Sequence, residues 1–282
     1  MATSEFSCTG HGGELAAYRW EPTDPATARY AVLLAHGYGE HMGRYEEFAA
    51  RLVADGAVVY GVDHVGHGRS AGERVLIEDL DRVVDDLRVV HEKARAEHPD
   101  LPFVLVGHSL GGTIATRYAQ RFGRDLRALV LSAPAIGQWA ALEALLAPDE
   151  VPDVPIDTAT LSRDPAVGAA YAADPLVWHG PFKRPTLLAM REMLGRIDNG
   201  PAFDDLPVIW LHGSDDGLVP REGSAVGWAR IAGPGDEEVT YPGARHEIFN
   251  ETNRRDVYAD VIGFVHRALR RSSGDAGRRG PR

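Results

Sequence analysis

The sequence lacks features that mark several common classes of protein. Its 282 residues include a single cysteine, Cys8, which excludes an intrachain disulfide framework and a cysteine-rich zinc site. Basic residues are the minority, since 30 lysines and arginines against 41 acidic residues leave a net charge of −11. This acidic balance argues against nonspecific nucleic-acid binding and against general attraction to anionic lipid, although a local apolar surface could still contact lipid.

Long hydrophobic runs are also missing. The longest apolar runs, such as residues 30–35, are far shorter than the roughly 20 residues that cross a bilayer. The first twenty residues show no basic region followed by an apolar one, so we expect no secretory signal there and a cytoplasmic location. No stretch matches a P-loop, a zinc-ligand spacing or a dinucleotide fingerprint, so neither a cofactor nor a metal is expected.

The sequence does contain an alternation of short apolar runs and amphipathic segments. A glycine-rich turn between residues 5–8 and 14–20 predicts a hairpin. The alternation predicts an α/β fold whose mostly parallel sheet is covered by helices on both faces. The predicted strands are residues 30–35, 57–62, 102–106, 126–131, 207–211 and 239–241, and the predicted helices are residues 44–54, 76–97, 111–122, 221–231 and 255–270.

The alternation stops between residues 133 and 203, a segment we call the insert. The insert is rich in proline and shows no clear strand, so it predicts short helices joined by loops. We therefore expect a core made of residues 1–132 and 204–270. Residues 271–282 are basic and contain glycine, serine and proline, which predicts a disordered tail.

The strongest chemical signal follows the predicted strand at residues 102–106. The segment Gly-His-Ser-Leu-Gly at residues 107–111 is a G-x-S-x-G motif between a strand and a helix. In that setting the serine occupies a strained turn that exposes its hydroxyl, and the first amides of the helix face the developing oxyanion. Ser109 is therefore the predicted nucleophile, and the side chain of His108 is expected to point away from it.

A serine nucleophile needs a histidine base and an acid that orients the base. In this kind of fold the acid and then the histidine follow the serine along the chain. Of the twelve histidines, only His246 has that order and follows a strand. Asp215 and Asp216 both follow the strand at residues 207–211, and chemistry alone does not separate them.

The loop after the first buried strand supplies a second candidate feature. Its sequence, His-Gly-Tyr-Gly at residues 36–39, occupies the place that donates one oxyanion-hole amide in this kind of fold. We assign the two amides to Tyr38 and Leu110. A further group, Asp63, His64 and His67, could form a metal site, but a glycine-rich strand-exit turn is favoured because no fourth ligand suggests itself.

Five segments together resemble the monoacylglycerol lipases of the α/β-hydrolase fold, and bacterial members most closely: AHGYGEHMGRY, DHVGHGRS, GHSLGG, LHGSDDGLVP and YPGARHEIFNE. The resemblance covers residues 6–270. It implies an eight-stranded sheet, assigns the acid to Asp216 and implies that the insert is a helical cap over an acyl-binding tunnel. Glu40 and Arg44 match a polar pair near the pocket mouth of that family.

The resemblance implies a serine hydrolase that cleaves monoacylglycerols to fatty acid and glycerol through an acyl-enzyme. The alternatives are a lysophospholipase or broad carboxylesterase and, in another class, a non-catalytic binding protein of the same fold. A dehalogenase is disfavoured because the turn holds Ser109 where that class needs an aspartate. We expect a lipid ester as the substrate and no nucleic-acid partner. We also expect transient contact between the insert and lipid aggregates or membrane. The sequence does not predict the oligomeric state.

Overall fold

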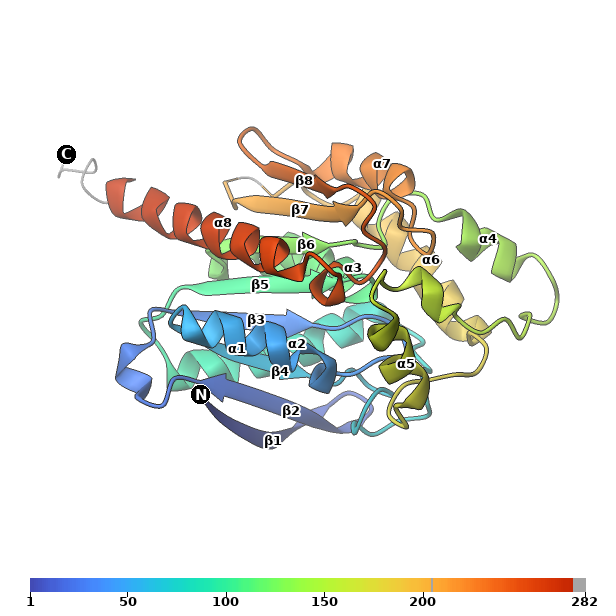
Figure 1. Cartoon of the computed structure of the whole chain (residues 1–282), viewed down its shortest axis with the longest axis horizontal. Helices are drawn as coiled ribbons and strands as arrows, with labels where there is room; N and C mark the ends of the chain where they lie inside the picture. The colour runs from blue at the N-terminus through green and yellow to red at the C-terminus, as the bar shows by residue number, and fades with distance from the viewer. Residues whose placement is uncertain (204, 276–282) are drawn as a thin grey trace.

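A single eight-stranded sheet lies at the centre of the molecule. The computed structural model describes residues 1–203 and 205–275, and the strand order is β1-β2-β4-β3-β5-β6-β7-β8 (Figure 1). The edge hairpin β1–β2 and the β2–β4 pair are antiparallel, and every other pair is parallel. The predicted mostly parallel sheet of the α/β-hydrolase fold is thus confirmed. The strands are β1 (Ala2–Gly10), β2 (Gly13–Glu21), β3 (Tyr30–Ala35), β4 (Ala57–Val62), β5 (Phe103–His108), β6 (Ala128–Ser132), β7 (Val208–Gly213) and β8 (Glu237–Tyr241).

Helices cover both faces of the sheet. Every residue of β3 to β7 is buried, as continuous apolar runs predict for strands covered on both sides. Helices α1 (Glu46–Ala54) and α8 (Arg254–Asp275) pack on one face and lie in front of the sheet in Figure 1. Helices α2 (Leu80–Glu97), α3 (Leu110–Phe122) and α7 (Arg221–Ile231) pack on the other face.

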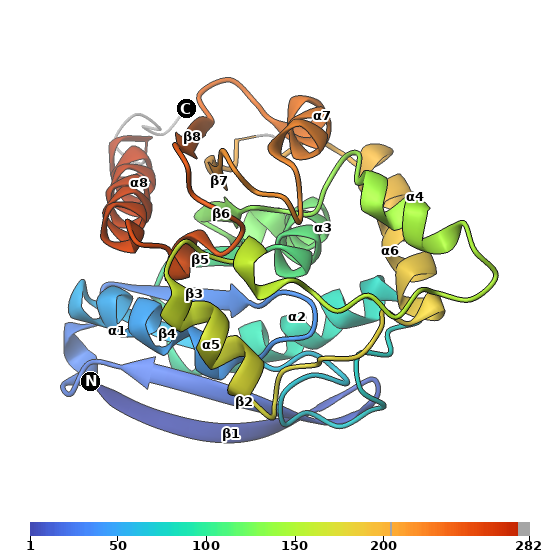
Figure 2. The ribbon, with the colours of Figure 1, turned by 45° about the vertical axis from the view of Figure 1, so that its right-hand side comes forward.

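The insert lies at the carboxyl ends of the parallel strands, where this class of fold binds ligands (Figures 1 and 2). It contains the predicted short helices: α4 (Ala140–Leu146), α5 (Pro165–Ala173) and α6 (Arg184–Asp198). Short 3-10 helices occur at Thr158–Thr160 in the insert and at Pro25–Thr27, Met42–Tyr45, Gly123–Asp125 and Ile248–Asn250 elsewhere. Figure 2 brings the insert forward and shows α4 beside α6.

Helix α6 belongs to the main core of the molecule. Its side chains Leu187, Met193 and Ile197 are buried in the same cluster as the apolar faces of α2 and α3. The Thr186 hydroxyl donates to the Val75 carbonyl at 2.8 Å and accepts the Ile77 N–H at 2.9 Å, which ties the start of α6 to the loop before α2. The division of the chain into a core and an insert at residues 133–203 stays a prediction from the sequence. In the structure, α6 of the insert packs as part of the core.

Some boundaries differ from the predicted ones. The helix predicted from residue 76 begins at Leu80, because the Asp79 side chain accepts the Asp81 N–H and caps it there. The last helix continues to Asp275, into the segment expected to form a tail, and the remaining tail residues 276–282 lie outside the described residues. In the described part of the chain, no helix combines the length and the apolar composition that a bilayer span requires.

Candidate active site

Ser109 occupies a strained turn between β5 and α3. Its φ is 55° and its ψ is −119°, a left-handed backbone that is unusual for a residue other than glycine. The glycines on either side are required by close contacts. A Cβ on Gly111 would lie 2.0 Å from the Ala35 carbonyl oxygen, and one on Gly107 would lie 2.3 Å from the Gly111 oxygen. The turn thus projects the Ser109 side chain into the pocket at the sheet end.

His246 lies at the same pocket and is oriented by a buried carboxylate. Its Nδ1–H donates to Asp216 Oδ2 at 2.7 Å. The Asp216 Oδ1 accepts the backbone N–H groups of Leu218 and Val219 at 3.0 and 2.9 Å, which holds the carboxylate in place. Asp215 is exposed, and its carboxylate accepts the neighbouring serine hydroxyl. The hydrogen bonds therefore give the orienting position to Asp216, the residue that the resemblance implied.

A second histidine supports the same carboxylate. His212 Nε2–H points to Asp216 Oδ2 at 3.1 Å and to the Val219 carbonyl at 2.9 Å, while its Nδ1 accepts the Trp210 indole N–H at 3.0 Å. Burial alone would raise the pKa of Asp216, but His246 and His212 lower it below its usual value. Burial alone would lower the pKa of His246, and the Asp216 charge raises it above the ordinary value. A charged carboxylate here can stabilise an imidazolium as it forms.

The two predicted oxyanion-hole amides come from different elements that meet at the pocket. Leu110 is the first residue of α3, and Tyr38 is in the loop after β3; both line the pocket with Ser109. Within the described residues, neither N–H donates to a protein acceptor. The Gly37 N–H donates to Glu40 Oε1 at 2.6 Å, which fixes the loop that carries Tyr38. Two unpaired amides beside a serine can bind the anionic oxygen of a tetrahedral intermediate.

The other histidines near the site are structural or line the pocket. The rings of His36, His64 and His67 pack against one another in tilted and edge-on pairs, and burial lowers the pKa of each, to about 3 for His64 and about 4 for His67. His36 Nδ1–H donates to the Gly37 carbonyl at 2.8 Å, so this cluster also braces the Tyr38 loop. Asp63 accepts the backbone N–H groups of Met42 and Arg69.

These contacts are those expected if Asp63, His64 and His67 belong to a glycine-rich turn after a strand. Among the described residues, no group of three or more His, Cys, Asp or Glu side chains is arranged to hold a metal ion.

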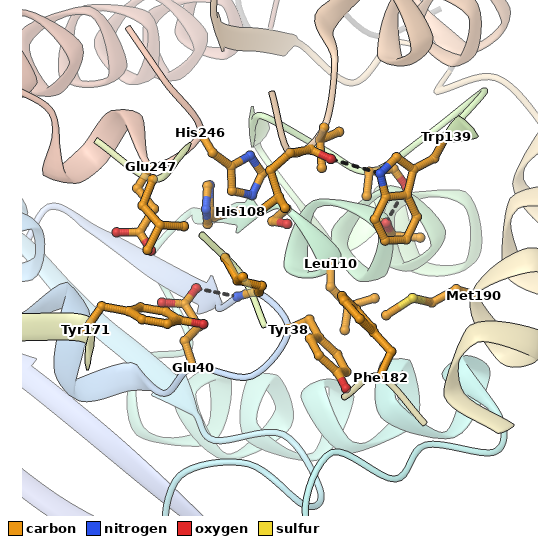
Figure 3. A pocket seen from close by; sticks show the side chains of 18 of the residues that line it. Tyr38, Glu40, His108, Leu110, Trp139, Tyr171, Phe182, Met190, His246 and Glu247 are labelled. Atoms are coloured by element: carbon orange, nitrogen blue, oxygen red, sulfur yellow. Dashed lines mark hydrogen bonds between the residues drawn. The ribbon is translucent and has the colours of Figure 1, made fainter. Parts of the chain in front are cut away.

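The expected orientation of His108 is wrong. Its ring is buried in the pocket with its centroid 4.8 Å from that of His246, and its Nδ1 lies 3.0 Å from the Ser132 hydroxyl (Figure 3). His108 is the last residue of β5, and the alternation along this strand places its side chain on the same face as Val104 and Val106, next to His246 and Phe249. Burial lowers the pKa of His108 to about 3, so the ring is neutral and contributes no charge to the pocket.

The pocket has a polar end and an apolar end. It contains about 680 Å³ of space next to Ser109 and His246, part of it open to solvent. Figure 3 shows Glu40, Tyr171 and Glu247 at one end, with His108 and His246 between them and the apolar side chains. The Tyr38 and Phe182 rings stack there with centroids 4.4 Å apart. Figure 3 shows Trp139, Phe182 and Met190 at the apolar end, and Leu194 and Leu218 also line the pocket.

Three contacts attach the insert to the loop that carries Tyr38. The Trp178 N–H donates to the Gly39 carbonyl at 2.8 Å. The His41 Nε2–H donates to the Asp174 carboxylate at 2.8 Å. The Tyr38–Phe182 stack is the third contact. The loop that carries the predicted oxyanion amide is therefore also the place where the insert is held.

Sequence reasoning missed several residues of this pocket. Glu247 follows the predicted base directly, and its position beside His246 was a usable signal that a carboxylate lies close to the site. Tyr171 lies in the insert, where no motif marks it. His212 was predicted to be structural or to line the pocket, and the structure shows that it contacts the Asp216 carboxylate.

The chain is similar in sequence and in structure to known hydrolases. The family model described as serine aminopeptidase, S33 matches residues 26–253. A monoacylglycerol lipase of Mycolicibacterium smegmatis is 41% identical over 276 residues, covering 93% of this chain and 96% of its own length. The human monoglyceride lipase is 30% identical and covers 82% of this chain and 79% of its own length. Among solved structures, a Paleococcus ferrophilus monoacylglycerol lipase superposes with a TM-score of 0.77 at 26% identity, covering 90% of this chain and 99% of that one.

Proposed function

The chain belongs to the serine aminopeptidase S33 family of α/β-hydrolases, together with the monoacylglycerol lipases, and from this premise we propose that it hydrolyses monoacylglycerols to fatty acid and glycerol. The enzyme is a carboxylic ester hydrolase. One observation carries the substrate assignment: the pocket beside Ser109 is apolar along one end and polar at the other. A monoacylglycerol has the same two parts, joined at the ester that Ser109 would attack.

The geometry supports a two-step acyl transfer. Ser109 Oγ attacks the ester carbonyl while His246 Nε2 takes its proton, and Asp216 holds the imidazole and stabilises its charged form. The Tyr38 and Leu110 amides bind the oxyanion. His246 then protonates the glycerol oxygen as the ester bond breaks, which leaves the acyl group on Ser109. Water, deprotonated by His246, releases the fatty acid and restores the serine.

An aminopeptidase activity, which the family description names, fits this pocket less well. Such an enzyme must bind the free ammonium of a peptide. The two carboxylates at the polar end, Glu40 and Glu247, already accept protein hydrogen bonds on all four oxygens, three of them from Arg44. Every carboxylate oxygen of these two described lining residues already has a protein donor, so an ammonium group would have to share or displace one of those contacts.

A fatty-acid release assay on a matched panel tests the proposal. The panel contains mono-, di- and triacylglycerol, lysophosphatidylcholine, a short p-nitrophenyl ester and an aminoacyl p-nitroanilide. We expect the highest kcat/KM on monoacylglycerol and a loss of at least about a thousandfold in Ser109→Ala. Preference for the lysolipid or for the short ester alone would favour a lysophospholipase or a broad carboxylesterase. Undiminished activity in Ser109→Ala would remove the nucleophile from the mechanism.

A further inference from the structure

Arg44 is shared by two buried carboxylates at the polar end of the pocket. Its Nη1 and Nη2 donate to the two oxygens of Glu247 at 2.7 Å each, and its Nη1 also donates to Glu40 Oε2 at 2.6 Å. Glu40 Oε1 accepts the Gly37 N–H and the Tyr45 hydroxyl, both at 2.6 Å. All three side chains of the Arg44–carboxylate group are buried. This arrangement places one cation against two anions beside the reacting groups.

The group carries a net negative charge. Burial alone would raise the pKa of Glu247, but the charge and hydrogen bonds of Arg44 lower it to about 2, so Glu247 is ionised near neutral pH. The same carboxylates raise the pKa of Arg44 above its already high ordinary value. His108 is neutral, and no lysine or second arginine lines the pocket in the described part of the chain. One negative charge at this end is therefore not balanced by a neighbouring cation.

That charge acts at short range and with little screening. The pocket walls are mostly apolar, and water and salt ions shield charges poorly in such surroundings. A second negative charge brought into the polar end would be repelled, and Arg44 could not compensate because it is already paired with both carboxylates. An uncharged polyol would meet no such penalty.

Tyr171 offers the kind of contact that an uncharged head group can use. Its ring lies over the Arg44 guanidinium at 4.9 Å from the ring centroid. Its hydroxyl is buried and has no hydrogen-bond partner among the described residues. Figure 3 shows it beside Glu40 at the polar end. A buried hydroxyl without a partner is costly, and a hydroxyl group of the substrate can satisfy it.

We propose that Glu247, with Glu40 on the same arginine, makes the polar end of the pocket select an uncharged polyol head group and reject a phosphate-bearing one. The enzyme then prefers monoacylglycerols to anionic lysophospholipids of the same acyl chain because of charge and not because of size. This inference rests on the proposed function, since it concerns which head groups the same site accepts.

The test compares two head groups of similar bulk. The substrates are oleoyl diglycerol, which is neutral, and oleoyl lysophosphatidylglycerol, which is anionic, with monooleoylglycerol as the reference. The variants are Glu247→Gln and Glu40→Gln, each of which removes one negative charge and keeps the side-chain volume. The readout is the ratio of kcat/KM on the anionic substrate to that on the neutral one. A general loss of activity or stability cancels in this ratio.

We expect wild type to accept both neutral esters and to disfavour the anionic one, and either variant to raise the ratio by roughly tenfold or more. Glu251→Gln is the matched control, because Glu251 is buried and paired with Arg163 but does not line the pocket. It changes the net charge of the molecule equally, so repulsion from an anionic lipid surface would shift all three variants alike.

The inference is overturned if the ratio is the same in wild type and in both folded variants, or if oleoyl diglycerol is rejected as strongly as the anionic ester. The first result would remove charge as the cause, and the second would assign the preference to size. Neither result touches the proposed function, which fails only if wild type does not hydrolyse monooleoylglycerol.

Discussion

At the residue scale, the proposed mechanism makes the proton on His246 set the pH range of the reaction. A protonated imidazole cannot take the Ser109 proton, so kcat/KM falls as pH decreases through the pKa of His246. Asp216 holds that pKa above the ordinary value despite burial. We therefore expect the acid limb on a soluble p-nitrophenyl ester to have an apparent pKa above about 6.5. Asp216→Asn moves that limb to lower pH and reduces kcat by roughly a thousandfold or more.

The measurement is a kcat/KM profile between pH 5 and 9 for both proteins, with equal folding checked by circular dichroism. An acid limb below about 6.5 in wild type would contradict the assignment of His246 and Asp216 as a coupled pair. An unchanged limb in Asp216→Asn would show that a different carboxylate governs the base.

The candidate triad could be predicted because each member has a local sequence signal. Ser109 lies between two glycines after a strand, and His246 follows the last strand. The sequence alone left Asp215 and Asp216 open, since adjacent carboxylates have the same chemistry. The charge environment could not be predicted, because Arg44 and Glu247 are 203 residues apart and pair only after folding. The catalytic roles themselves stay predictions until the variants are assayed.

At the scale of the elements, the strands were predictable and the helix ends were less so. A strand buried on both faces reads as a continuous apolar run, as in β3 and β4. Helix ends depend on capping contacts such as that of Asp79, and a periodic apolar pattern does not report them. The insert has neither kind of pattern, so the sequence predicted only that it contains short helices joined by loops, without their number or bounds. Whether it acts as a cap stays a prediction.

Two apolar side chains of the insert are well placed to contact lipid. Val154 is 60% exposed and Leu188 is 39% exposed. Replacing both with serine removes apolar surface from the outside of the insert without emptying the core. We expect kcat/KM on emulsified monoacylglycerol to fall several-fold, with little change on a soluble short ester. The measurement is the ratio of the two activities in the double variant.

Val89→Ser supplies the control for this prediction. Val89 is 38% exposed but lies on α2, outside the insert. An equal loss on both substrates in the double variant, or the same ratio in Val89→Ser, would mean that the insert does not capture lipid aggregates.

At the scale of the whole molecule, the insert and the sheet share one core through α6. Leu187 is fully buried in that core, while its neighbour Leu188 faces outward. We expect Leu187→Ala to cost about 2–5 kcal/mol of unfolding free energy and to shift a single thermal transition as a whole. Leu188→Ala should change stability by no more than about 0.5 kcal/mol.

Differential scanning calorimetry of the two variants and of wild type measures the number of thermal transitions and the shift of each. If Leu187→Ala splits the transition into two, or lowers only a minor early one, the insert unfolds independently and the shared core does not couple it to the sheet.

The attachment of the insert to the Tyr38 loop has a consequence for how this enzyme can diversify. Substitutions near Trp178, Asp174 or Phe182 lie far along the chain from Ser109, yet they act on the loop that carries the predicted oxyanion donor Tyr38. In a library screen, substitutions of Trp178 and Asp174 would register as losses of turnover, whereas Phe182 also lines the pocket, so its substitution would affect substrate affinity as well. New substrate ranges are then reached most easily through Met190 and Leu194 of α6, which line the pocket and are not among the contacts with that loop, so different parts of the insert tolerate change to different degrees.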